Sequence, residues 1–290
     1  FSNVLYILKL YQLSLIAYVV MKLLSRIKHQ NIDFDSLVLF SLASLTLFNL
    51  FQVFVFGSFR AELLFSDTSS GPLGLLASSF LIYGLVRPRF IVTNLIVFLS
   101  LFVLILAVSK SFILSAPFIF TFLSRKNLSV RKISNLVILS VVAFLFLSFE
   151  NPISKSIGFL YDTSMNISES TSLAFRLSRH WFVGFTRHYG DDFLFLFGGG
   201  VQSISISIDS LYFYLFYSVG VLGSLLFLSS AMLLAFRDKI FACYFIVMLV
   251  SGVFLETSLI SYRGIEPSLI LLSIATFLNK SISTRVKVFD

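Results

Sequence analysis

The chain has 290 residues, of which 57% are hydrophobic and only 12% are charged. In soluble globular domains roughly a quarter of all residues are charged. This composition therefore excludes an ordinary soluble domain and indicates an integral membrane protein. Its apolar runs of about 16 to 22 residues fit the roughly 20 residues with which an α-helix crosses a bilayer. A β-barrel would instead alternate apolar and polar residues over roughly ten-residue segments, and no such alternation is present.

The net charge of +8 does not indicate nucleic-acid binding, because the basic residues recur in short linkers between apolar runs. The one cysteine, Cys243, lies inside an apolar run, so no disulfide can form within the chain. The sequence has no zinc-ligand spacing and no phosphate-binding loop. We therefore expect neither a metal nor a cofactor.

Nine transmembrane helices are predicted, which gives an all-α, polytopic helical bundle. The chain starts at Phe1 rather than Met, and we expect a missing N-terminal portion. The predicted spans cover residues 4–24, 37–56, 71–86, 90–108, 112–123, 133–149, 209–236, 240–260 and 268–278. Four regions follow: helices over 1–149 with a short outer loop at 57–70, a large loop over 150–208, helices over 209–279, and a basic tail at 280–290.

Charge sets the predicted orientation of the bundle. If the spans alternate sides, one side collects fourteen of the 22 basic residues, and this side is predicted to be cytoplasmic. The loops at 57–70 and 150–208 then face outward. Since the sequence has no ATP-binding motif and no large cytoplasmic region, any chemistry is expected at the outer face, on substrates that carry their own free energy.

Each outer loop has an arginine followed eleven positions later by a glycine: Arg60 with Gly71, and Arg179 with Gly190. This paired spacing resembles that of the O-antigen polymerases, which extend lipid-linked polysaccharides. These proteins and the O-antigen ligases share a second signature: His, then Asn, Ser or Gln, nine residues, and Gly-x-x-Gly. The chain has Asp209, Ser210, nine residues, Gly220, two residues and Gly223. The missing His puts a ligase in doubt and favours a polymerase.

The resemblance implies a GT-C-like glycosyltransferase in the bacterial inner membrane, with its active face in the periplasm. The implied reaction needs no metal and transfers a glycan from a polyprenyl-pyrophosphate donor to a lipid-linked repeat unit. Undecaprenyl-pyrophosphate-linked oligosaccharides and membrane lipids are the implied partners, with a chain-length regulator protein as a further one. No nucleic-acid partner is expected.

The reaction requires cations for the departing pyrophosphate and a base for the acceptor hydroxyl. Guanidinium groups grip phosphate in a bidentate manner, and a positioned base takes up the proton. We predict Arg176 and Arg179 as catalytic cations and Asp209 as the base. Five further residues are predicted to bind substrate: Arg60, Arg187, His180, Glu256 and Arg263.

Simpler roles stay open for the same residues. The arginines could bind phospholipid, Asp209 could cap a helix, His180 could lie at the interface, and Glu256 could pair with Arg263. Residues 171–188 are predicted to form an interfacial helix in the large loop. Asp191 and Asp192 are predicted as a charged turn, and Gly198, Gly199 and Gly200 as a flexible connection.

Three alternative functions remain. A ligase would transfer finished polymer to the lipid A core. A flippase of lipid-linked sugars would need a polar pathway and inverted repeats, for which the sequence gives no sign. A structural partner in a synthesis complex would need no chemistry at all.

Overall fold

The computed structural model describes residues 19–20, 22–23, 33–56, 71–87, 90–107, 115–116, 118–119, 123, 190–199, 211–252 and 262–286. Its principal elements are α2 (Phe34–Phe54), α3 (Gly71–Val86), α4 (Phe90–Leu106), α10 (Asp192–Phe197), α11 (Leu211–Arg237), α12 (Lys239–Gly252) and α14 (Tyr262–Val286). All elements within these ranges are helices, which confirms the all-α class. The nine predicted spans include residues outside these ranges, so their number stays a prediction.

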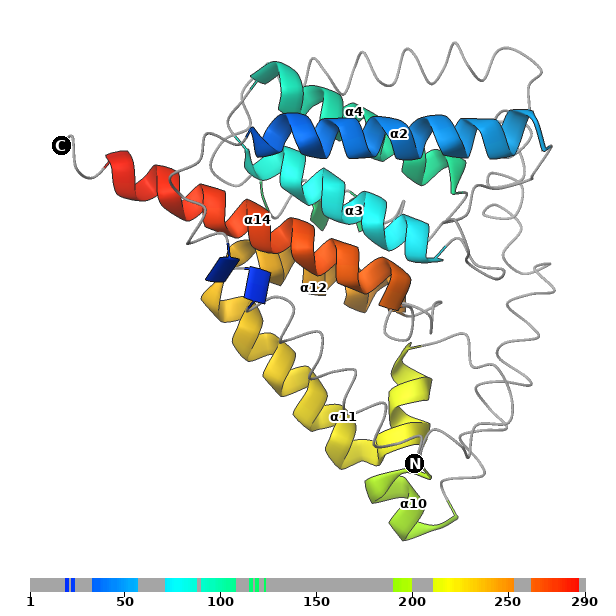
Figure 1. Ribbon diagram of the computed structural model, residues 1–290. Helices are drawn as coiled ribbons and strands as arrows, with labels where there is room; N and C mark the ends of the chain where they lie inside the picture. The colour runs from blue at the N-terminus through cyan, green and yellow to red at the C-terminus, as the bar shows by residue number, and fades with distance from the viewer. Residues whose placement is uncertain are drawn as a thin grey trace.

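The bundle is built around α3, which lies between α2 and α4 on one side and α14 on the other in Figure 1. Side chains 72–84 of α3 are all buried, and the helix contacts α4, α12 and α14. A helix that is apolar on every side belongs to a bundle interior. Gly84 permits the close approach of α4, because an added Cβ would lie 2.9 Å from Cγ2 of Val97 and 3.1 Å from the carbonyl oxygen of Thr93.

α2 buries a mixed polar and apolar face and exposes large apolar side chains on the other face. Its buried face comprises Asp35, Val38, Leu42, Thr46, Asn49 and Val53. Its other face exposes Phe40 by 73% and Leu47 by 68%. Such a surface is unfavourable in water and suits contact with lipid. Two helices in the described part of the chain are long and apolar enough to cross a membrane, Phe34–Phe54 and Tyr212–Ser229.

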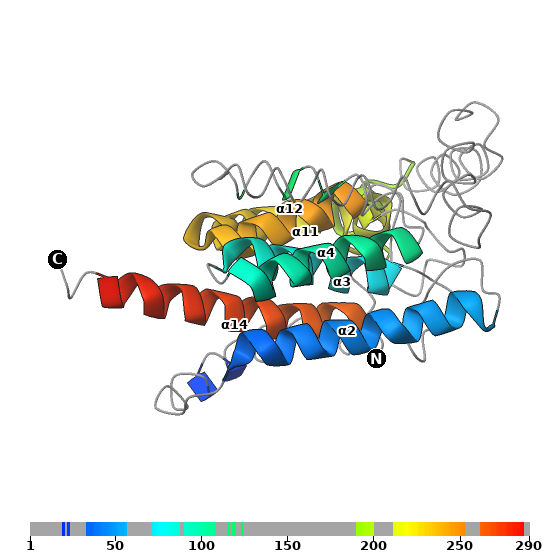
Figure 2. The same ribbon diagram turned by 90° about the horizontal axis from the view of Figure 1, so that it is seen from above.

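Successive helices of the bundle run in alternating directions. In Figure 1 the beginnings of α2, α4 and α12 lie at the same end as the last turns of α3, α11 and α14. Figure 2, seen from above, shows the same arrangement for α2 and α14. These six ends are the ones that the charge pattern assigns to a common side. We call this the Arg87 end of the bundle.

The predicted bounds of the spans are correct for α3 and wrong in part for α2 and α14. α3 spans Gly71–Val86 as predicted, whereas α2 begins at Phe34, three residues earlier than predicted. α14 begins at Tyr262 and includes most of the predicted turn at 261–267. Pro267 lies inside α14 and removes one backbone hydrogen bond. The packing of α14 on α3 explains why this turn signal does not stop the helix.

Candidate functional site

Most of the predicted site lies outside the described residues. This holds for Arg60, Arg176, Arg179, His180, Arg187, Asp209 and Glu256, and for the interfacial helix predicted at 171–188. Arg263 lies in the first turn of α14, and its side chain is not described. The structure therefore gives the helices from which the predicted site would be built.

Three of the predicted residues are close in sequence to helix ends that lie at one corner of the bundle. Asp209 stands two residues before α11, Glu256 four residues after α12, and Arg263 is the second residue of α14. The start of α11, the end of α12 and the start of α14 all lie at one end of the bundle in Figure 1, and we call this end the corner. The Tyr212 hydroxyl links the start of α11 to the end of α12, because it donates a 2.9 Å hydrogen bond to the Leu249 carbonyl. The corner is remote from the Arg87 end.

Gly220 breaks α11 into two arms, residues 211–219 and 221–237. Its backbone lies at φ 67° and ψ −171°, a region that is essentially restricted to glycine. Figure 1 shows the two arms meeting at a bend beside α10. The span predicted over residues 209–236 is therefore not one continuous helix, because it is interrupted at Gly220. Hydropathy alone does not show this break, since both arms are apolar.

The end of α10 lies directly against this bend. Gly198 also has a positive φ, 73°, and an added Cβ would lie 2.5 Å from the backbone nitrogen of Gly220. A Cβ on Gly220 would in turn collide with the carbonyl of Leu196. The N–H of Gly199 donates a 2.9 Å hydrogen bond to the Tyr217 carbonyl. We call Gly198, Gly199 and Gly220 the glycine seat.

Gly223 is required by the same bend, and Gly190 is not. A Cβ on Gly223 would lie 2.5 Å from Cβ of Val219, the last residue of the first arm. A Cβ on Gly190 would meet no atom within 4 Å. Both glycines of the Gly-x-x-Gly signature are therefore needed for the backbone of α11, whereas Gly190 tolerates a side chain.

Two sequence interpretations near the seat need correction. Gly198 and Gly199 were predicted to lie in a flexible connection, but both are fixed against α11. Asp191 was predicted as part of a charged turn, and it is the N-cap of α10. The described part of the chain contains no group of three His, Cys, Asp or Glu side chains that could hold a metal ion.

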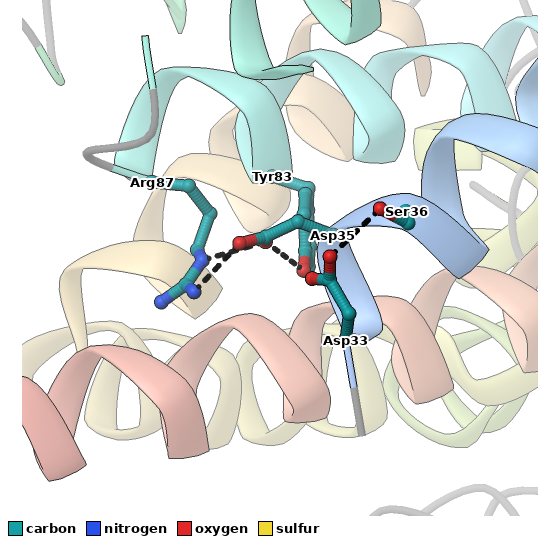
Figure 3. Close-up of polar contacts among 5 residues, drawn as sticks. All are labelled: Asp33, Asp35, Ser36, Tyr83 and Arg87. Atoms are coloured by element: carbon teal, nitrogen blue, oxygen red, sulfur yellow. Dashed lines mark hydrogen bonds and ion pairs between the residues drawn. The ribbon is translucent and has the colours of Figure 1, made fainter. Parts of the chain in front are cut away.

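A polar cluster that was not predicted closes the Arg87 end (Figure 3). Arg87 donates from Nε to Asp35 Oδ1 and from Nη2 to Asp35 Oδ2, both at 2.9 Å. The Tyr83 hydroxyl donates to Asp35 Oδ1 at 2.7 Å. The side chains of Arg87 and Asp35 are only 9% and 2% exposed. The cluster joins the first turn of α2 to the end of α3.

Helix dipoles and burial determine the electrostatics of this cluster. Asp35 lies at the positive end of α2, and Arg87 follows the negative end of α3, so both charges are favourably placed. Burial lowers the pKa of Arg87, but the hydrogen bonds and the charge of Asp35 outweigh this effect and leave the pKa above its usual value. Arg87 Nη1 is buried and has no hydrogen-bond partner among the described residues.

The sequence contained a signal for this ion pair. Alternating spans put the start of α2 and the end of α3 on the same side, where Asp35 and Arg87 can meet. In the sequence alone, Arg87 looks like the other basic residues of the short linkers between apolar runs. The pair forms because a charge beside apolar helices is stabilised best by an opposite charge.

No family model, curated protein or solved structure matches this chain. The functional proposal therefore depends on the sequence patterns, the broken helix and the corner of the bundle.

Proposed function

We propose that this chain is a glycosyltransferase of the O-antigen polymerase kind, embedded in the bacterial inner membrane with its active face in the periplasm. The proposed donor is a glycan on polyprenyl pyrophosphate, and the acceptor is a lipid-linked repeat unit. The lipid-compatible surface of α2 and the alternating helices support the membrane placement. In this placement the Arg87 end is cytoplasmic and the corner formed by α11, α12 and α14 faces outward.

The observation that supports the proposal most is the role of Gly220 and Gly223. The signature singles out these two glycines by spacing alone. In the structure, Gly220 has a backbone conformation reserved for glycine, and Gly223 has no room for a side chain. Two independent features thus coincide at the same two residues, which favours a shared architecture over a chance match in spacing.

The proposed reaction balances without a metal. The acceptor hydroxyl oxygen bonds to the anomeric carbon of the donor while the bond from that carbon to the pyrophosphate oxygen breaks. Asp209 takes the hydroxyl proton, and polyprenyl pyrophosphate leaves with its charge held by Arg176 and Arg179. Preorganised cations at a developing charge are among the largest contributions to catalysis. Arg60, Arg187, His180, Glu256 and Arg263 are proposed to bind the sugars and the diphosphate.

Reconstitution in liposomes tests the proposal. Purified protein is supplied only with lipid-linked repeat units, and a polymerase extends them to a ladder of longer products. Arg179→Ala should abolish the ladder, whereas the matched control Arg237→Ala, at the Arg87 end, should leave it intact. A ladder that persists in Arg179→Ala contradicts the arginine assignment. Activity that appears only with a lipid A core acceptor indicates the ligase, and transbilayer movement of the substrate without extension indicates the flippase.

A further inference from the structure

The six-residue helix α10 has an unusual surface for a connection between two larger parts of a chain. Phe193 is 66% exposed and Phe197 is 54% exposed, and Leu196 between them is also exposed. The two rings lie side by side with their centroids 5.1 Å apart. The face of α10 formed by these three residues is therefore apolar and open.

We propose that α10 is a membrane anchor that lies at the bilayer surface, with Phe193, Leu196 and Phe197 in the lipid. The inference goes beyond the proposed reaction and does not depend on it. It concerns a segment different from the interfacial helix predicted at 171–188.

The backbone of α10 is suited to a lipid environment, where each unpaired polar group is costly. Asp191 Oδ1 accepts hydrogen bonds from the N–H groups of Phe193 and Leu194, at 2.9 and 3.2 Å. The Asp191 carbonyl accepts from Phe195, and the Leu194 carbonyl accepts from Gly198. These four N–H groups, at the two ends of this short helix, are thus paired within the protein.

The helix bonded to α10 also exposes large apolar side chains. Leu222, Leu225 and Leu226 of α11 are exposed directly after the bend, and they lie within Tyr212–Ser229, a stretch that is long and apolar enough to cross a membrane. The glycine seat fixes α10 to this bend, and the rings of Phe195 and Phe216 add an edge-to-face contact at 5.6 Å. If α11 contacts lipid, this junction holds α10 beside the part of α11 that exposes the three leucines.

Polarity and size favour lipid over a second protein. The exposed carboxylates of Asp191 and Asp192 stand at the beginning of α10, where they can reach water while the rings enter the membrane. Two partly exposed Phe rings offer roughly 300 Å² of surface. A stable protein interface needs roughly 800 Å² from each partner, so this face alone is too small for one.

Fluorescence quenching tests the anchor. In a Trp181→Phe background, which removes the native tryptophan, a single tryptophan is introduced by Phe193→Trp. The protein is reconstituted in uncharged phosphatidylcholine liposomes that carry bromine either near the headgroup end or near the tip of the acyl chains. At an insertion depth of roughly 5–10 Å, the headgroup-proximal bromines should lower the emission about twofold and the tip bromines less.

The matched control is Gly190→Trp, three residues earlier at an exposed position with open space around it. Acrylamide in the water should quench this tryptophan, and brominated lipid should not. The inference fails if Phe193→Trp behaves like the control. It also fails if the emission of Phe193→Trp is insensitive to both quenchers, or responds to the protein-to-lipid ratio, since either result means that protein covers the face.

Discussion

Breaking the ion pair of Asp35 and Arg87 should destabilise the bundle far more than removing both partners together. Asp35 is 1% exposed, and its carboxylate receives two hydrogen bonds from Arg87 and one from Tyr83. Arg87→Met keeps an apolar stem but removes the cation that pairs with the buried carboxylate of Asp35, so we expect a loss of about 3–5 kcal/mol in unfolding free energy. Asp35→Leu should cost a similar amount because it leaves the buried Arg87 guanidinium without its carboxylate partner.

The double variant Asp35→Leu, Arg87→Met removes both charges and should lie within about 1 kcal/mol of the wild type. Asp33→Asn is the control. Asp33 is exposed and accepts a 2.8 Å hydrogen bond from Ser36, so its replacement should cost about 0.5 kcal/mol.

The chain carries its own reporter for this double-mutant cycle. Cys243 is the one cysteine of the sequence and is 1% exposed, so its thiol reacts with a maleimide when the bundle opens. The labelled fraction is measured across a titration of denaturing detergent in mixed micelles. The assigned ion pair would be refuted if the unfolding free energies of the single variants lay within about 1 kcal/mol of that of the wild type. It would also be refuted if the double variant lost at least as much unfolding free energy as the two single variants together.

Three further predictions use the same labelling assay. Tyr83→Phe removes one hydrogen bond to a charged acceptor and should lower the unfolding free energy by about 1.5 kcal/mol, which is less than the loss expected for Arg87→Met. Equal losses for the two variants would contradict this prediction. Gly220→Ala forces a side chain into a glycine-only conformation and should cost about 1–3 kcal/mol, whereas Gly190→Ala should change little; equal effects would remove the case for the seat. Gly84→Val should push α3 and α4 apart at a cost of about 1–3 kcal/mol in unfolding free energy. An unchanged midpoint of the detergent titration would show that the two helices are not closely packed at Gly84.

The apolar helices could be predicted from the sequence because length and hydropathy determine them. α3 has the predicted bounds, since its apolar run is cut sharply by Gly71 and by Arg87. The start of α2 was placed too late because Asp35 and Ser36 look like linker residues. Asp35 is instead part of the helix, and a partner 52 residues away neutralises its charge. A partner at such a distance is not visible in local composition.

The glycine seat could be located from the sequence but not interpreted. The signature identified Gly220 and Gly223, yet glycine is common in membrane helices and does not by itself break them. The break depends on the carbonyl of Leu196, which approaches Gly220 more closely than any side chain would permit. The same contact turns Gly198 and Gly199 from an apparent linker into a fixed junction.

The two ends of the bundle differ in how they are held, and this difference bears on where the chemistry is placed. At the Arg87 end, a buried ion pair and a tyrosine join α2 to α3, and separating these groups would expose charges without partners. On the other side of the molecule, α11 is broken at Gly220 and its backbone is bonded to the end of α10, and the first arm of α11 leads from this break back to the corner formed by α11, α12 and α14. A rigid end suits a scaffold, whereas a broken helix leaves backbone and side chains free of regular pairing, as binding sites in membrane helices require. This asymmetry favours the part of the molecule remote from the Arg87 end, where the first arm of α11 joins the break to the corner that adjoins Asp209, Glu256 and Arg263, for the proposed transfer.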